Sequence, residues 1–314
     1  MSGIDRREKA HENTGPEHRL LSKKGGSRMK IGCRVTYTKD PDNPRYVQDL
    51  AVKFQSFVDL GISSCQLNVW NQELMTQESA DYVLECAAKT GMEISALWAG
   101  WSGPCEWNFT VGPQVLGLVP PAYRSMRLEQ LKNGSRFAGM LGLTDMITHV
   151  GFLPENPNDP DFVGTVGALR DLCRFMKDRG QYFLFETGQE TPTTLLRAIE
   201  AIGTGNVGVN LDTGNLICYG KGNPVDALDV IGPYVRNTHM KDCFYPTCGS
   251  RLGKEARMGD GKVDFPRFVA KLQELGYTGP LTIERETYGP QQVQDIVYAK
   301  EMLEKIKLEL GIGD

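Results

Sequence analysis

The stretch Asn206–Asp242, NVGVNLDTGNLICYGKGNPVDALDVIGPYVRNTHMKD, contains two short β-type runs with one helix-length segment between them. The runs are Val207–Leu211 and Tyr234–Thr238. Each is followed by a side chain that can bind a metal, Asp212 after the first and His239 after the second. Buried parallel strands point such residues out of their C-terminal ends, where the connecting loops build binding sites. The stretch therefore predicts a parallel α/β fold with a metal-capable site at the strand ends.

The segments on either side of this stretch repeat the arrangement. Tyr182–Phe185 is an apolar run followed by Glu186, and Leu281–Ile283 is an apolar run followed by Glu284. Four successive strand ends thus offer Glu, Asp, His and Glu. Any one of these residues could instead pair with a neighbour or face water, but four ligand-type residues in four successive strand ends favour one shared site.

The whole chain from residue 29 onward alternates between strand-like and helix-like segments. We expect strands at Ile31–Val35, Ile62–Val69, Met92–Leu97, Asp145–His149, Tyr182–Phe185, Val207–Leu211, Tyr234–Thr238 and Pro280–Ile283. We expect helices at Arg45–Leu60, Gln77–Thr90, Ala122–Leu141, Asp161–Arg179, Thr193–Ile202, Asp264–Leu275 and Val293–Leu310, and one starting near Pro224. Eight strand-then-helix units predict an α/β fold of the (β/α)8 TIM-barrel type.

The alternative to a barrel is an open, doubly wound sheet. Such sheets often carry a glycine-rich fingerprint after the first strand, where this chain has RVTYTKDPDN instead. The long Gly/Pro/Trp-rich segment Trp98–Pro121 exceeds the length of an ordinary connector, and we interpret it as a candidate lid.

Composition limits the kind of protein this is. The chain has 314 residues, of which 40% are hydrophobic and 24% charged, with a formal net charge of −4. This balance is typical of a soluble globular protein, and the negative charge argues against nucleic acid as a partner. No run is apolar enough for a membrane span, and the N-terminus lacks the apolar core of a secretory signal. The sequence leaves the oligomeric state open, with a homo-oligomer among the options.

The N-terminus and the cysteines complete this description. Residues 1–28 are polar, so we expect a flexible tail there and a single barrel domain over residues 29–314. The eight cysteines form no CxxC pair, and most have apolar neighbours, as free buried thiols do. A reducing cytoplasm is therefore the expected location.

Three carboxylates and one imidazole make a mostly oxygen-donor site. Such a set suits one divalent cation, Mn²⁺ or Mg²⁺, with Co²⁺ or Zn²⁺ tolerated, better than it suits a structural zinc. A cation of this kind can chelate a carbonyl oxygen and the adjacent hydroxyl and stabilise an enediolate. Two carboxylates on opposite sides of the chelated carbon can then remove and return a proton.

The motifs FETGQE, NLDTGN, THMKD, MGDGKVDF and LTIERE resemble those of the sugar isomerase/epimerase superfamily with a xylose-isomerase-like barrel. This group includes ketose 3-epimerases, hydroxypyruvate isomerase, inosose dehydratase and repair enzymes of the endonuclease IV type. The resemblance covers residues 29–314 and is most specific in residues 182–286. It implies that Glu186, Asp212, His239 and Glu284 are the four metal ligands and that the two glutamates form the acid–base pair.

Two departures from the pattern narrow the chemistry. Many members of the group have a histidine three residues after the strand-six aspartate, where this chain has Asn215, which can contact a sugar hydroxyl. Only His149 and His239 lie within the expected barrel, too few for the trinuclear zinc cluster of the repair endonucleases.

Further residues are candidates for binding a small-molecule sugar or polyol, and each has a structural alternative. They are His149, Asn215, Lys241, Arg257 and Trp98. His149 could instead cap the rim, Lys241 could pair with Asp242, and Trp98 could be rim packing. The basic loop around Arg257 could hold a phosphate or carboxylate, although a solvated charged face explains it better.

The function hypothesis is a divalent-metal-dependent isomerase or epimerase of a ketose, keto-sugar or related polyol ketone. A dehydratase or other lyase using the same metal site is the first alternative. A DNA-repair hydrolase of the endonuclease IV type and a non-catalytic sugar-binding barrel are the others.

Overall fold

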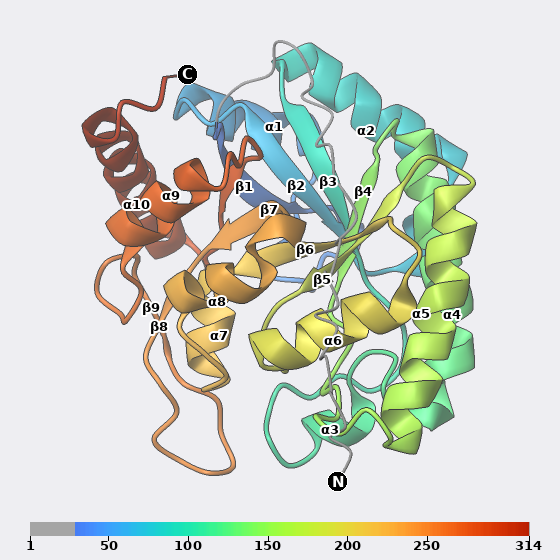
Figure 1. Cartoon of the computed structure of the whole chain (residues 1–314). Coiled ribbons are helices and arrows are strands. Elements are labelled where there is room, and N and C mark those ends of the chain that lie inside the picture. The colour runs from blue at the N-terminus through green and yellow to red at the C-terminus, as the bar shows by residue number, and fades with distance from the viewer. Residues whose placement is uncertain (1–28, 314) are drawn as a thin grey trace, which may run out of the picture.

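Eight parallel strands close into a barrel with helices around it (Figure 1), in the spatial order β1-β10-β7-β6-β5-β4-β3-β2. The computed structural model describes residues 29–313. The strands are β1 (Ile31–Thr36), β2 (Ser64–Val69), β3 (Glu93–Ala99), β4 (Asp145–Thr148), β5 (Tyr182–Glu186), β6 (Val207–Asp212), β7 (Val235–Met240) and β10 (Leu281–Ile283). The predicted (β/α)8 barrel is confirmed. The predicted tail, residues 1–28, lies outside the described range.

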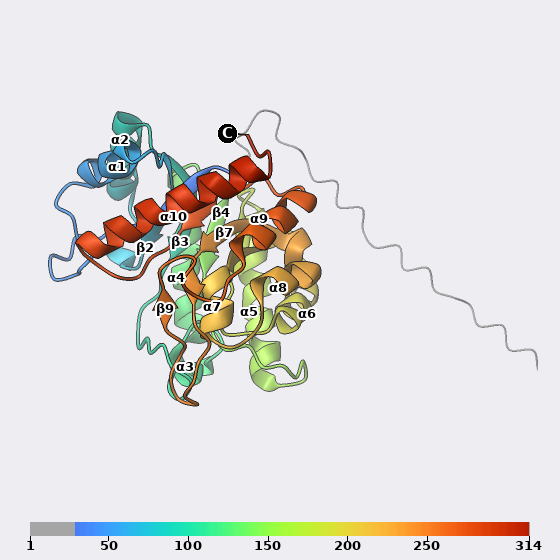
Figure 2. The same cartoon turned by 90° about the vertical axis from the view of Figure 1, so that its left-hand side faces the viewer.

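The helices that cover the barrel follow the strands in chain order. They are α1 (Leu50–Asp59), α2 (Gln77–Thr90), α4 (Pro121–Met140), α5 (Pro160–Lys177), α6 (Pro192–Ile202), α8 (Pro224–Ile231), α9 (Phe265–Glu274) and α10 (Pro290–Glu309). Figure 2 shows α10 running along the outside of the barrel. In the described part of the chain, no helix is both long and apolar enough to cross a membrane.

Local sequence signals explain where these helices begin and end. The Thr76 side chain accepts a hydrogen bond from the Ser79 backbone N–H and caps α2, and Gly91 ends that helix in the left-handed conformation. Thr191 and Gly203 do the same for α6. Capping of this kind contributes about 1 kcal/mol per helix.

Two apolar clusters pack against the strands of the barrel. Inward-facing Ala96, Ile147 and Leu184 form a fully buried cluster with Trp98. Outward-facing strand residues belong to a separate, larger cluster with the helices. Burying one large apolar side chain contributes about 1.5–3 kcal/mol, so the two clusters together hold the strand ends in place.

The structure differs from the predicted elements in three places. α1 begins at Leu50 instead of Arg45, because the Asn43 side chain accepts from the Arg45 N–H in a turn and Asp49 caps the helix. A short helix, α7 (Thr213–Cys218), follows β6 directly and was not predicted. The segment between the predicted strand Tyr234–Thr238 and the predicted helix Asp264–Leu275 contains a small antiparallel pair, β8 (Asp242–Cys243) with β9 (Glu255–Ala256).

The segment between β3 and α4, the predicted lid, is fixed to the barrel by one buried arginine. It contains α3 (Gly112–Val115) and lies at the same end of the barrel as the β8–β9 hairpin (Figures 1 and 2). Arg127 of α4 donates to the carbonyls of Ser102, Pro104, Val115 and Gly117 over 2.6–3.1 Å. Its guanidinium also stacks 3.9 Å from the Trp101 ring centroid. Arg127 is thus the main side-chain anchor of this segment, alongside backbone hydrogen bonds such as that from the Leu118 N–H to the Val150 carbonyl at 2.7 Å.

Replacing Arg127 with Leu should loosen this segment while the barrel stays folded. Each buried carbonyl left without a donor costs about 1–3 kcal/mol. We expect faster amide hydrogen exchange over residues 101–118 and unchanged protection of the strands, measured by mass spectrometry. Arg136→Leu is the control, because Arg136 is an exposed arginine on the same helix. Equal protection of residues 101–118 in both variants would contradict the role given to Arg127.

Candidate metal centre and active site

The four predicted ligand residues meet at one end of the barrel. Glu186 ends β5, Asp212 ends β6, His239 lies within β7 and Glu284 directly follows β10. These strands are consecutive neighbours in the sheet, so their C-terminal ends form one arc. One ligand atom from each residue lies within 4.8 Å of all the others, and none of the four residues is more than 4% exposed.

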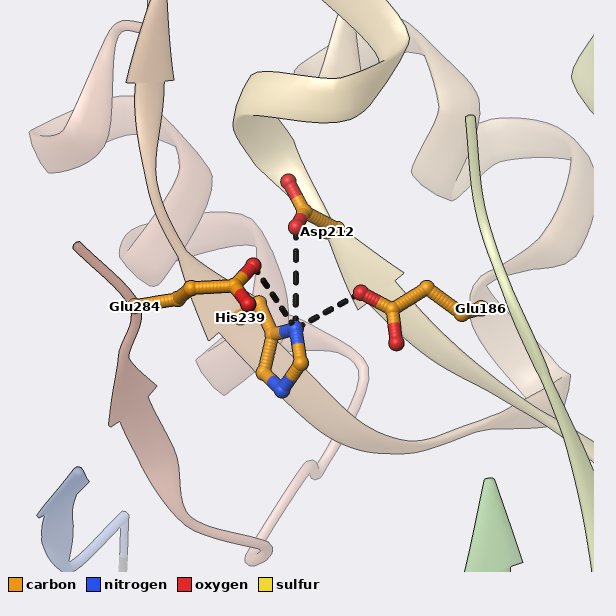
Figure 3. Close-up of side chains that lie close together, drawn as sticks. All are labelled: Glu186, Asp212, His239 and Glu284. Atoms are coloured by element: carbon orange, nitrogen blue, oxygen red, sulfur yellow. Dashed lines mark hydrogen bonds and ion pairs between the residues drawn. The ribbon is translucent and has the colours of Figure 1, made fainter. Parts of the chain in front are cut away.

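The imidazole of His239 lies at the centre of the group. Its Nδ1 is 2.7 Å from Glu186 Oε1, 3.2 Å from Glu284 Oε2 and 3.6 Å from Asp212 Oδ2. Figure 3 shows Glu186 and Glu284 on opposite sides of this nitrogen. One carboxylate thus lies on each side of His239 Nδ1, and the third, that of Asp212, lies above it in the same view.

The electrostatics of the group suit a cation. Burial opposes a charged imidazole, but the carboxylates of Glu186 and Glu284 outweigh it and raise the pKa of His239 well above its usual value. Asp212 Oδ2 has no hydrogen-bond partner among the described residues although Asp212 is fully buried. A buried carboxylate oxygen without a donor is costly, and a bound divalent ion would satisfy it. The donor set of three carboxylates and one imidazole therefore fits such an ion.

Gln66 of β2 determines which nitrogen of His239 faces the carboxylates. Its amide nitrogen donates to Asn210 Oδ1 at 3.0 Å and lies 3.3 Å from Asn237 Oδ1, so its oxygen is left as an acceptor. That oxygen is 2.6 Å from His239 Nε2. The Nε2–H therefore donates to Gln66, and Nδ1 is the atom available to a metal.

Two cations besides His239 contact the Glu284 carboxylate. The Arg34 guanidinium of β1 pairs with Glu284 Oε1, and Lys241 Nζ lies 3.4 Å from Glu284 Oε2. Lys241 also donates to Glu286 at 2.6 Å. Burial opposes ionisation, but Arg34 and Lys241 lower the pKa of Glu284 well below its usual value. Arg34 and Glu286 were not predicted. The available signal was an arginine within the first buried strand.

Four of the predicted substrate-binding residues surround the same centre. Lys241 Nζ donates to Asn215 Oδ1 at 3.2 Å, and Trp98 Nε1 donates to Glu186. The ring of His149 lies 5.9 Å from that of Trp98 and 5.1 Å from that of Trp107. Two residues of the predicted lid segment, Trp98 and Trp107, thus lie beside the centre.

His149 is held in one orientation by two residues that the sequence analysis missed. Its Nδ1 is 3.1 Å from Gln189 Oε1, and the Gln189 amide donates to the Tyr219 hydroxyl at 3.1 Å. The Nδ1–H therefore donates to Gln189, which leaves Nε2 as an acceptor. Burial lowers the pKa of His149, so its neutral form is favoured.

A barrel of this order with these residues at its strand ends matches one known family model. The xylose isomerase-like TIM barrel model matches residues 54–306. The chain belongs to this family. A solved xylose isomerase domain protein from Planctomyces limnophilus is 30% identical with a TM-score of 0.81, covering 90% of this chain and 99% of that one.

Two further relatives differ in the reaction that their names give. A solved D-tagatose 3-epimerase-like protein is 19% identical with a TM-score of 0.68, covering 90% of this chain and 98% of that one. Inosose dehydratase from Clostridium beijerinckii is 24% identical over 170 residues, which are 49% of this chain and 56% of that protein. The likeness of the first shows the common fold. The family supports an enzyme of the sugar isomerase, epimerase or dehydratase kind.

Arg257, the fifth predicted binding residue, interacts with residues of its own loop and of α10. Its guanidinium pairs with Asp260 at 3.0 Å and lies 4.2 Å from the ring centroid of Tyr298. The nearby turn is folded around the Asp242 carboxylate, which accepts from the backbone N–H groups of Gly259, Gly261, Lys262 and Val263 over 2.9–3.1 Å. These donors are therefore already used, and the role of Arg257 stays a prediction.

The expectation of free thiols is wrong for two cysteines. Cys218 at the end of α7 and Cys243 in β8 form a disulfide, while the other six are free. Composition did not reveal the pair because it is 25 residues apart in the chain and meets only through the fold. The bond joins the segment that begins at Asp212 to the one that follows His239.

Replacing Gln66 with Met should weaken metal binding without unfolding the barrel. Residues that orient a ligand histidine typically contribute about 10–100-fold to metal affinity. We expect a loss of that size for Mn²⁺ in isothermal titration calorimetry. Gln181→Met is the matched control, since Gln181 is an equally buried glutamine bonded to Ser135. Unchanged Mn²⁺ affinity in Gln66→Met would remove Gln66 from the support of the site.

Glu190, in the loop after β5, makes stability depend on pH. It is 3% exposed, its Oε1 has no hydrogen-bond partner among residues 29–313, and burial raises its pKa to about 8. Between its ordinary pKa near 4.5 and about 8, the folded protein binds the proton that the unfolded chain releases. The buried Glu190 carboxyl therefore lowers the free energy of unfolding as pH rises from about 4.5 to about 8.

Glu190→Gln should remove this penalty. The free energy of unfolding of the variant, relative to that of the wild type, should rise by about a few kcal/mol between pH 5 and pH 8.5, since each unit of pKa shift corresponds to about 1.4 kcal/mol. The measurement is urea denaturation at a series of pH values. A stability difference that stays constant across this range would show that Glu190 ionises normally in the folded protein.

Proposed function

We propose that the protein is a divalent-metal-dependent isomerase or epimerase of a ketose, keto-sugar or related polyol ketone. The observation that carries the proposal is the placement of Glu186 and Glu284 on opposite sides of His239 Nδ1 (Figure 3). Two carboxylates placed in this way can remove a proton from one face of a carbon and return one to the other face.

The metal that we propose is one Mn²⁺ ion held by Glu186, Asp212, His239 and Glu284. Mg²⁺, Co²⁺ and Zn²⁺ are compatible with the same donors. When bound, the ion supplies Lewis acidity, which makes a proton next to a carbonyl easier to remove.

The two glutamates have different surroundings, which is how acid and base roles separate at one pH. Arg34 and Lys241 keep Glu284 ionised. Glu186 accepts a hydrogen bond from Trp98 Nε1, which orients its second oxygen. We assign proton removal and proton return to this pair.

Lys241, Asn215, His149 and Trp98 are the residues that we propose contact the substrate. Lys241 and Asn215 form one polar side, and neutral His149 offers an acceptor for a hydroxyl. The Trp98 ring offers an aromatic surface for the apolar part of a sugar. Arg257 would have to leave Asp260 to take part.

A lyase is the second candidate, and the inosose dehydratase relative favours it. The same proton removal would be followed by loss of a hydroxyl group from the adjacent carbon. Lys241 lies 3.4 Å from Glu284 and could supply the proton that the departing hydroxyl needs. Loss of water from the product separates this reaction from epimerisation.

Changing Glu186 or Glu284 to Gln tests the acid–base roles. Each variant keeps one ligand oxygen but lacks the basic carboxylate, so metal should still bind while turnover falls by about 10²–10⁴-fold. The measurement is a screen of ketoses and inososes in D₂O with Mn²⁺, followed by NMR for deuterium at carbon and for loss of water.

The matched control is Glu155→Gln, which changes an exposed glutamate outside the site. Near-normal epimerisation by either site variant, with metal shown to be bound, would reduce that glutamate to a ligand only. One variant is expected to retain proton exchange on one face, because one base remains.

A further inference from the structure

A cavity of about 440 Å³ lies beside the C-terminal end of β1. Its walls come from the end of β1, the loop before α1 and the first turns of α1 and α2. They include Thr36, Thr38, Gln48 and the three tyrosines Tyr37, Tyr46 and Tyr82. The volume falls in the range of about 300–1,000 Å³ that small-molecule sites occupy.

The metal centre itself leaves little room for a whole substrate. Its four residues are at most 4% exposed, and their ligand atoms lie within 4.8 Å of one another. A substrate that places its reacting carbons there must extend elsewhere. We propose that the β1 cavity is a subsite for a second ring, so that the substrate is a keto-sugar carrying a further sugar or aglycone. This inference rests on the proposed function.

The walls of the cavity suit a neutral, polyhydroxylated ring. Tyr37 and Tyr82 are fixed by bonds to Ser79 and to the Leu50 N–H, with ring centroids 6.1 Å apart. Tyr46 is 36% exposed. Aromatic faces of this kind pack against the C–H side of a sugar.

Two polar side chains of the cavity wall are available to a ligand. Within the described part of the chain, the side chains of Thr36 and Gln48 form no hydrogen bonds, and each can both donate and accept one. Lys39 and Glu78 carry opposite charges at the cavity, so no net charge selects an anion. A phosphate or carboxylate ligand is therefore disfavoured there.

Two residues close in the chain to the cavity wall, Arg34 and Arg45, interact with residues at the metal centre or next to it. Arg34, which pairs with Glu284, is two residues before Thr36, about 7 Å along the strand. Arg45, next to Tyr46, lies 3.9 Å from Glu286, which accepts from Lys241. Residues of the cavity wall are thus close neighbours in the chain of residues that pair with Glu284 and Glu286.

Asn68 of β2 provides an independent indication of a ligand between the two places. It is paired in register with Thr36 on one side and Trp98 on the other. Gln66 points into the barrel, so Asn68, two residues on, faces the same way. Its side chain is fully buried, yet neither its nitrogen nor its oxygen has a partner in residues 29–313. A buried amide without a partner is costly, and a substrate hydroxyl that reached Asn68 once this side of the site opened would satisfy both atoms.

The test compares one ketose with larger molecules built on it. D-Fructose and three disaccharides that contain it in different linkages (lactulose, isomaltulose and turanose) are titrated into the full-length protein loaded with Mg²⁺. Affinity is measured by saturation-transfer NMR, which needs no turnover. We expect at least one disaccharide to bind about tenfold more tightly than fructose. If none binds more tightly than fructose, the subsite does not exist.

Three variants test whether the tighter binding of a disaccharide than of fructose comes from the β1 cavity. Tyr46→Ala removes an aromatic wall and Val47→Trp fills the cavity, so each should reduce the tenfold advantage to about onefold. Val52→Trp, the same substitution at an exposed position of α1, should keep it. An advantage that survives both Tyr46→Ala and Val47→Trp overturns the proposal.

The experiment distinguishes a failure of the proposed subsite from a failure of the proposed function. Deuterium exchange into fructose without a disaccharide advantage would support the chemistry and overturn the subsite. A disaccharide advantage lost in Tyr46→Ala and Val47→Trp, with no exchange into any sugar, would support the subsite and overturn the isomerase or epimerase assignment.

Discussion

The imidazole of His239 among three buried carboxylates is the interaction on which the active end of the barrel depends. Taking charged groups out of water costs several kcal/mol each unless they are paired and hydrogen-bonded. In the metal-free protein the raised pKa of His239 gives the carboxylates a cation, with Nδ1 2.7 Å from Glu186. A divalent ion would replace that proton, so metal binding and deprotonation of His239 are coupled.

The residues around this group alternate in charge outward from the centre. Glu284 contacts three cationic side chains, those of His239, Arg34 and Lys241, and Lys241 in turn pairs with Glu286. Removing one member would leave a buried charge unpaired, which typically costs about 3–5 kcal/mol. The ligands are therefore positioned by a network that reaches from β1 to β7.

The sequence predicted that Glu186, Asp212, His239 and Glu284 come together because their placement follows from one rule. C-terminal ends of neighbouring parallel strands meet, and each of four successive strands has a ligand-type residue at or within one residue of its C-terminal end. Gln66 and Arg34 were out of reach, since their roles depend on barrel closure and on the register of β1 with β2 and β10. The Cys218–Cys243 disulfide could not be predicted for a similar reason, because its two cysteines meet only in the folded barrel. The loop of Arg257 shows the opposite limit, because its basic residues left an anion site open beside the favoured interpretation as a solvated charged face, and Asp242 already takes the backbone donors.

The contacts that close the site differ between the side near Arg127 and the side near β1. This difference affects how a substrate can reach the buried centre. On the lid side, Arg127 is fully buried and binds four carbonyls, so opening there would expose several unsatisfied groups at once. On the β1 side, Arg45 and Glu286 approach to only 3.9 Å, and their side chains are 24% and 43% exposed. A partly exposed pair of this kind contributes about 0–1 kcal/mol. Separating Arg45 from Glu286 therefore costs less than releasing Arg127, and the unpaired amide of Asn68 lies toward the same side, in the strand next to β1.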